Sequence, residues 1–106
     1  MTGDQQRLLQ DWIDRVMSRP SHECGVFVGS EGQPFGTRAR PWDEPDLMIS
    51  GLVQDDGITV DLDCYGARIT WEITGITEVE PADHPWGAGL RVVRAGAEGP
   101  EVVWLV

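Results

Sequence analysis

The sequence predicts an α+β fold in which an N-terminal helix packs on a five- to six-stranded antiparallel, strongly bent sheet or partly closed barrel. Apolar residues recur at helical spacing near the N-terminus, and from position 47 onward they alternate with polar residues. The alternating segments are joined by short turns that contain glycine. A chain of 106 residues can bury one core, so we expect a single domain over residues 1–106.

The helix is expected over residues 2–18. Thr2 and Gln5 fit a capping box at its start, and Pro20 follows its end. One apolar stripe is formed by Leu8, Leu9, Trp12, Ile13, Val16 and Met17. A helix with one apolar face is typical of a helix that covers a sheet.

The strands are expected at about 24–29, 47–54, 58–65, 68–80, 88–95 and 101–106. Residues 30–46 are rich in proline and glycine and show no periodicity, so we expect a long connection there. Gly75 interrupts the alternation within 68–80, as a bulge or a bend would. The final segment is apolar on both faces, which favours an inner or helix-covered strand over a free edge.

Two turns set the expected strand register. Asp56-Gly57 and Gly66-Ala67 both suit two-residue hairpin loops. Each loop turns the same residues of the 58–65 strand toward the core, and this agreement supports the assignment of faces. The outer face would then carry the rows Ser50–Asp63–Thr70 and Leu52–Asp61–Glu72.

This register raises a question about the acidic residues of the outer face. Asp61 would lie opposite Glu72, and like charges that face each other destabilise a strand pair. Aspartate is also disfavoured within strands. Three explanations are open: the register differs, an arginine such as Arg68 neutralises the acids, or a binding partner supplies the positive charge. We favour the partner.

The charge is concentrated in one part of the chain. The formal net charge is −10, and residues 43–83 hold eleven acidic residues against one basic residue, Arg68. Such a segment repels nucleic acid and anionic membranes and attracts basic proteins or cations. A solvated surface without a partner is the simpler alternative.

Two tryptophans stand in loops beside proline and acidic residues, Trp42 in RPWDEPD and Trp86 in DHPWG. A rigid aromatic side chain next to charges is typical of an interface anchor, although a tryptophan that caps the end of a barrel would look the same. The predicted partner-binding residues are Trp42, Asp43, Glu44, Asp46, Asp61, Asp63, Glu72 and Trp86.

No motif indicates catalysis or a bound metal. His22, Cys24, Cys64 and His84 have the residue types of a zinc site but no usable ligand spacing. DDGITVDLD resembles a calcium loop only loosely, and no glycine-rich phosphate loop is present. We therefore expect no enzyme activity, no cofactor and no metal, and two cysteine thiols rather than a disulfide.

The sequence has no apolar run long enough to span a membrane and no signal peptide, so we expect a bacterial cytoplasmic protein. The leading hypothesis is an acidic protein-binding module that docks a basic partner, of immunity-protein, antitoxin or nucleic-acid-mimic type. That partner would be a nucleic-acid-directed toxin or another nucleic-acid-binding protein. The alternative is a small-molecule-binding or catalytic β-barrel-like domain with a site near the 30–46 loop, His84 and Trp86. A third possibility is a subunit that assembles through its edge strands.

Overall fold

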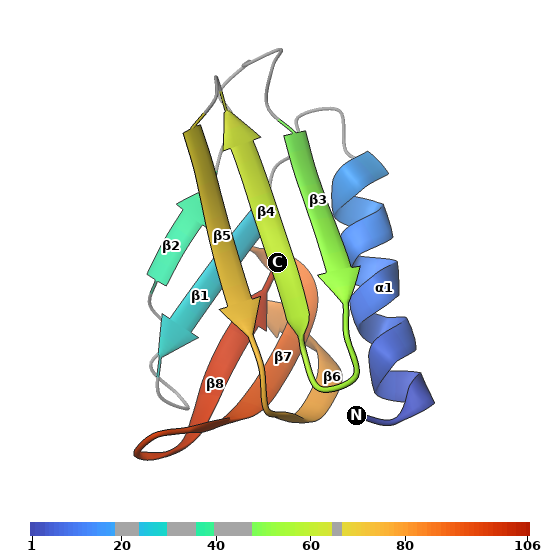
Figure 1. Ribbon diagram of the computed structural model, residues 1–106, viewed down its shortest axis with the longest axis vertical. Coiled ribbons are helices and arrows are strands. Elements are labelled where there is room, and N and C mark those ends of the chain that lie inside the picture. The colour runs from blue at the N-terminus through green and yellow to red at the C-terminus, as the bar shows by residue number, and fades with distance from the viewer. Residues whose placement is uncertain (19–23, 30–35, 40–47, 65–66) are drawn as a thin grey trace.

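The computed structural model describes residues 1–18, 24–29, 36–39, 48–64 and 67–106; at 24, 29, 36–39, 48–49, 62–64 and 67–69 it describes the backbone alone. One helix, α1 (Gly3–Ser18), accompanies two antiparallel sheets (Figure 1). The first sheet has the order β2-β1-β8-β7-β6, and the second has the order β3-β4-β5. The strands of the first are β1 (Cys24–Gly29), β2 (Gly36–Ala39), β6 (Ile76–His84), β7 (Gly87–Gly96) and β8 (Gly99–Leu105). Those of the second are β3 (Met48–Val53), β4 (Ile58–Cys64) and β5 (Ala67–Ile73).

The α+β class with antiparallel sheets is confirmed, but the single bent sheet or partly closed barrel is wrong. The predicted strand 68–80 is divided between the two sheets, as β5 and the start of β6. Gly75 lies between them with φ of 71°, a left-handed conformation that glycine adopts at little cost. Its carbonyl accepts a hydrogen bond from the Ala95 backbone N–H at 2.9 Å. The chain therefore leaves one sheet and enters the other at this glycine.

The predicted connection over 30–46 contains a short strand, β2, which pairs with β1 from Cys24↔Ala39 to Phe27↔Gly36. The segment GTRA has no apolar alternation that would indicate a strand. The rest of that connection lies outside the described residues. β8 lies between β1 and β7, which confirms the inner position predicted for the final strand.

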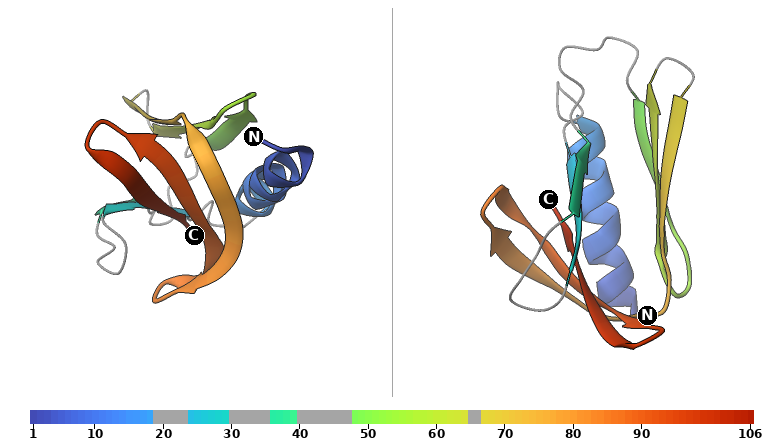
Figure 2. Two further views of the ribbon diagram at one scale, coloured as in Figure 1. Left: turned by 90° about the horizontal axis from the view of Figure 1, so that it is seen from below. Right: turned by 90° about the vertical axis from the view of Figure 1, so that its left-hand side faces the viewer.

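The core lies between α1 and the two sheets (Figure 2). The helix buries Leu9, Trp12, Ile13 and Val16 against β3, β6 and β7. Within the described residues, no helix is long and apolar enough to cross a membrane. The sheets contribute Val26, Ile58, Val60, Ile73, Ile76, Leu90, Val92, Val103 and Leu105.

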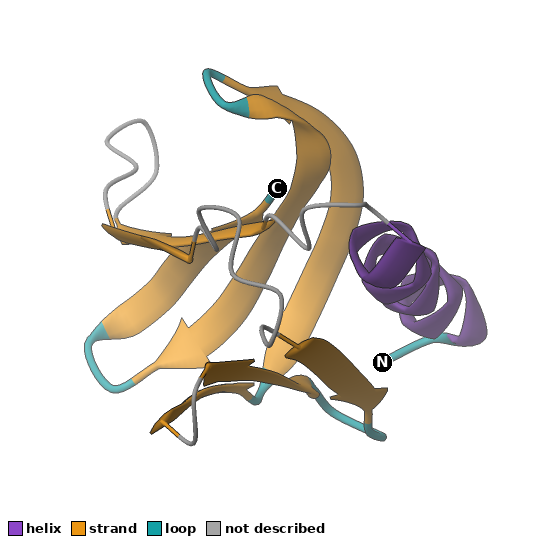
Figure 3. Cartoon of the chain, turned by 90° about the horizontal axis from the view of Figure 1, so that it is seen from above, coloured by secondary structure: helices purple, strands orange, loops and turns teal. Residues whose placement is uncertain are grey.

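The predicted capping box of α1 is confirmed. The Gln5 backbone N–H donates to Thr2 Oγ1 at 3.2 Å, and the Thr2 backbone N–H donates to Gln5 Oε1 at 2.8 Å. Gln5 Nε2 also donates to the Thr77 carbonyl on β6, while Gln6 Nε2 donates to the Gln54 carbonyl beside β3. The first turn of the helix therefore contacts both sheets. Figure 3 shows the helix beside strands of both.

The register of β4 differs from the prediction by two residues against each neighbour. Val53 pairs with Ile58, and Cys64 pairs with Ala67, so the rows are Ser50–Asp61–Thr70 and Leu52–Thr59–Glu72. A shift of two residues keeps every side chain on its predicted face. The turn spans residues 54–57 and is longer than the predicted two-residue loop. Gly57 lies against β5: a Cβ there would be 2.1 Å from the Ile73 carbonyl oxygen.

Candidate functional site

The predicted site residues do not gather at one place. Trp42, Asp43, Glu44 and Asp46 lie outside the described residues. Asp61 and Asp63 belong to β4 and Glu72 to β5, on the outward face of the three-stranded sheet. Trp86 belongs to the turn between β6 and β7, in the other sheet.

The outward acids are not opposed to one another as predicted. Asp61 lies opposite Thr70, whose hydroxyl donates to Asp61 Oδ1 at 2.6 Å. Glu72 lies opposite Thr59, and Asp63 is paired in register with Arg68. The expected repulsion between Asp61 and Glu72 was therefore a consequence of the wrong register, although partner binding by these residues stays a prediction.

Trp86 and His84 belong to a cluster of four aromatic rings on one side of the five-stranded sheet. The rings of Phe27 and His84 are stacked with centroids 4.6 Å apart, and those of Phe27 and Trp86 are stacked at 5.8 Å. Trp104 packs at a tilt against His84 at 5.6 Å. Phe27 and Trp104 are direct cross-strand partners on β1 and β8. The sequence indicated His84 and Trp86 but missed Phe27 and Trp104, whose strands become neighbours only through the sheet order.

A glycine leaves the space that the Phe27 ring occupies. A Cβ at Gly25 would lie 2.5 Å from Cε2 of Phe27, so the phenyl ring folds over a position without a side chain. The stack on Phe27 therefore depends on glycine at position 25 of β1.

His84 is held in a buried, neutral state at the centre of this cluster. Its exposed fraction is 9%, and burial lowers its pKa below the usual value of 6.5. The backbone N–H of Trp86 donates to His84 Nδ1 at 3.2 Å, which places the imidazole proton on Nε2. Within the described part of the chain no carboxylate hydrogen-bonds to this imidazole.

The cluster also has an exposed side and an unsatisfied donor. Trp86 is 51% exposed, which makes it a large aromatic surface fixed from behind by Phe27. The indole Nε1 of Trp104 is buried and, among the residues that the structure describes, has no hydrogen-bond acceptor. In the parts of the chain that are described, no group of three or more histidine, cysteine, aspartate or glutamate residues is arranged to hold a metal ion.

A separate groove of about 790 Å³ lies between α1 and the β6–β7 hairpin. It is lined by Leu8, Asp11, Asp14, Arg15, Pro81, Ala82, Asp83, Ala88, Gly89 and Leu90. Sequence reasoning missed this groove because its two walls are more than sixty positions apart along the chain.

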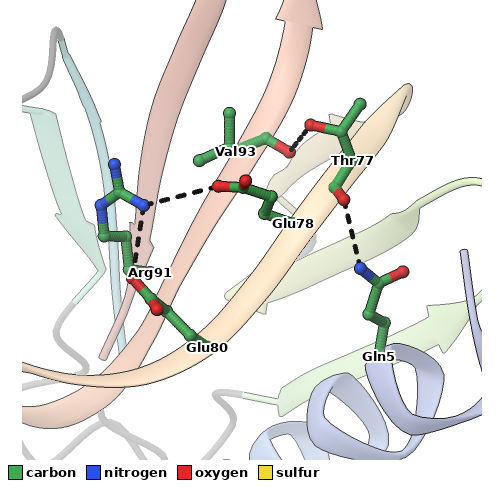
Figure 4. A network of polar contacts seen from close by, with 6 residues as sticks. All are labelled: Gln5, Thr77, Glu78, Glu80, Arg91 and Val93. Carbon is green, nitrogen blue, oxygen red and sulfur yellow. Dashed lines mark hydrogen bonds and ion pairs between the residues drawn. The ribbon is translucent and has the colours of Figure 1, made fainter.

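Two arginines of β7 neutralise acids elsewhere on the five-stranded sheet. Arg91 Nη1 lies 3.3 Å from Glu80 Oε1 and 3.8 Å from Glu78 Oε2, and beside this pair Thr77 links β6 to the Val93 carbonyl (Figure 4). Arg94 Nη1 lies 3.4 Å from Glu101 Oε1. These two arginines therefore form ion pairs with acids of the same sheet.

Comparisons with protein-family models, with curated proteins and with solved structures found no match for this chain.

Proposed function

We propose that this protein is an acidic protein-binding module that docks a basic surface of a partner protein, in the manner of an immunity protein, an antitoxin or a nucleic-acid mimic. The observation that carries the proposal is the exposed surplus of negative charge. Among residues with described side chains, the arginines are Arg7, Arg15, Arg91 and Arg94. The exposed acids there are Asp4, Asp11, Asp14, Asp55, Asp56, Glu72, Glu78, Glu80, Asp83 and Glu98.

This charge supports rapid and selective encounter with a basic protein. A surface of one sign raises the association rate with a partner of the opposite sign and disfavours acidic partners. Trp86 adds an aromatic anchor, since a half-exposed indole backed by a stacked ring loses little conformational freedom when it is covered.

Affinity capture from a lysate of the source cells, at low and at moderate salt, tests this function. Wild type is compared with an Asp55→Lys/Asp56→Lys/Glu72→Lys variant, whose substitutions lie at exposed positions. We expect wild type to retain a basic protein that salt releases and that the variant retains poorly. Retention of the same proteins by both, or binding that salt does not change, contradicts the proposal.

A second candidate function, binding of a small ligand at the aromatic cluster, is favoured by the buried Trp104 Nε1 beside the neutral imidazole of His84. A ligand oxygen that accepts from this indole would satisfy a donor that costs free energy when it is left unpaired. Screening of small ligands by tryptophan fluorescence tests it, with His84→Phe as the control for a response that comes from the cluster. An unchanged response in that variant contradicts the second candidate.

A further inference from the structure

The groove beside α1 has an apolar floor, and the strand register explains why. Pro81 pairs with Leu90, and Asp83 pairs with Ala88, so these four residues lie on the face of the sheet that the helix covers. Pro81, Ala88 and Leu90 form the apolar floor, and Asp83 lies at its rim. The helix supplies Leu8 as the facing apolar side chain. Near the tip of the hairpin a volume of about 790 Å³ stays open between the helix and the strands.

The rim of the groove is acidic on both sides. Asp11 and Asp14 rise from the helix, and Asp83 rises from β6, with Arg15 as the basic residue of the lining. Gln10 Nε2 donates to Asp14 Oδ1 at 3.0 Å. Within the described residues none of these three acids forms a salt bridge, in contrast to Glu78, Glu80 and Glu101. The groove therefore combines an apolar floor with carboxylates that lack a cationic partner in this part of the molecule.

This combination fits one kind of occupant. Arginine and lysine carry a charged head on an apolar stem, so the stem covers an apolar floor while the head reaches an acidic rim. An anionic ligand would be repelled by the three carboxylates, and an uncharged one would gain no attraction from them.

We propose that the groove between α1 and the β6–β7 hairpin is the docking site for an arginine- or lysine-bearing segment of the partner protein. This inference rests on the proposed function and gives it a location. Trp86 lies in the turn of the same hairpin, but its ring stacks on Phe27 on the opposite face of the sheet, so the groove is assigned from its own lining alone.

The experiment uses a short blocked peptide of alternating arginine and leucine as the probe. The same peptide with glutamate in place of arginine is the control. Amide chemical shifts of the labelled full chain are followed by two-dimensional NMR. We expect the arginine peptide to shift the amides of Leu8, Ala82 and Ala88, and the glutamate peptide to leave them unchanged. Shifts confined to β4 and β5, or equal shifts with both peptides, would overturn the assignment of the groove.

Two variants with the same change in net charge separate the groove from the general charge of the molecule. Asp11→Asn/Asp83→Asn removes one rim acid from each wall of the groove, and Asp4→Asn/Glu98→Gln removes two exposed acids elsewhere. We expect the rim variant to weaken peptide binding roughly tenfold and the other variant less than about threefold. The amide spectrum of each variant reports whether it is folded.

The outcomes distinguish this inference from the function on which it rests. Equal weakening by both variants overturns the groove but leaves the acidic binding module intact. Absence of peptide binding, or formation of a dimer through the groove, also overturns the groove as a site for a basic segment. The proposed function is then judged by the capture experiment, which does not use the groove variants.

Discussion

At the scale of single residues, Gly89 of β7 lies against the backbone at the end of β8. A Cβ at this position would be 2.1 Å from the Leu105 carbonyl oxygen and 3.0 Å from the Val106 Cα. Backbone atoms cannot move away as the end of a side chain can. We expect Gly89→Ala to lower the free energy of unfolding by about 1–3 kcal/mol, measured by urea denaturation.

Gly3→Ala is the matched control for that substitution. Gly3 lies in the first turn of α1, and a Cβ there would meet no atom within 4 Å. Alanine is the better helix former, so this variant should be as stable as wild type or up to about 1 kcal/mol more stable. If Gly89→Ala were equally well tolerated, the close approach of the two strands would be wrong.

His84 makes stability depend on pH. Its pKa is lowered by burial in the folded protein, so at pH values between the folded and unfolded pKa the unfolded chain binds more protons. The contribution of His84 to stability is therefore fully present above about pH 6.5 and is lost as the pH falls through the folded pKa.

The measurement is thermal unfolding of wild type and His84→Phe across this range of pH. Phenylalanine retains an aromatic ring for the stack on Phe27 but does not titrate. We expect wild type to lose stability relative to the variant as the solution is acidified below pH about 6.5. Parallel curves for the two proteins would show that His84 does not contribute.

At the scale of secondary-structure elements, the start of α1 depends on the reciprocal bonds between Thr2 and Gln5. Thr2→Ala removes the hydroxyl that accepts from the Gln5 backbone N–H. We expect a loss of about 0.5–2 kcal/mol in the free energy of unfolding, measured in urea. Thr2→Ser keeps a hydroxyl and should restore most of that loss; a Thr2→Ala variant as stable as wild type would contradict the role of the cap.

The elements show which signals in the sequence carried information and which did not. Helical spacing and strand alternation report burial, so α1 and the faces of β3, β4 and β5 could be predicted. The register could not be predicted, because a glycine can be required for two reasons. It suits a tight turn, as predicted for Gly57, but in the structure Gly57 allows close approach of the Ile73 carbonyl. The strand β2 could not be predicted because GTRA shows no apolar alternation, and only its backbone pairing with β1 identifies it.

The candidate sites, too, could be predicted from the sequence only in part. His84 and Trp86 were indicated by their residue types in one short segment. Their partners Phe27 and Trp104 come from β1 and β8, and the sequence of the segment does not encode which strands will be neighbours. The groove depends on the position of the helix over Leu90, which is a property of tertiary packing alone.

At the scale of the whole molecule, a net charge of −10 acts over a radius of gyration of 13.2 Å. The Debye length is about 30 Å at 0.01 M salt and about 10 Å at 0.1 M, so added salt screens repulsion across the molecule. We expect the Tm to rise as sodium chloride is raised between these concentrations, and to rise less in an Asp55→Asn/Asp56→Asn variant. A Tm that falls with salt would show that attractive pairs such as Arg91–Glu80 outweigh the repulsion.

The strand β6 forms one edge of the five-stranded sheet, and its features affect whether copies of this chain can pair edge to edge at high concentration. Pro81 presents no N–H there, Gln5 occupies the Thr77 carbonyl, and the register is irregular between Ile76 and Glu78. The exposed Asp83, for which the described residues supply no salt bridge, adds repulsion between like strands. We therefore expect this edge to be a poor template for the addition of another strand, even though it lies next to an open groove.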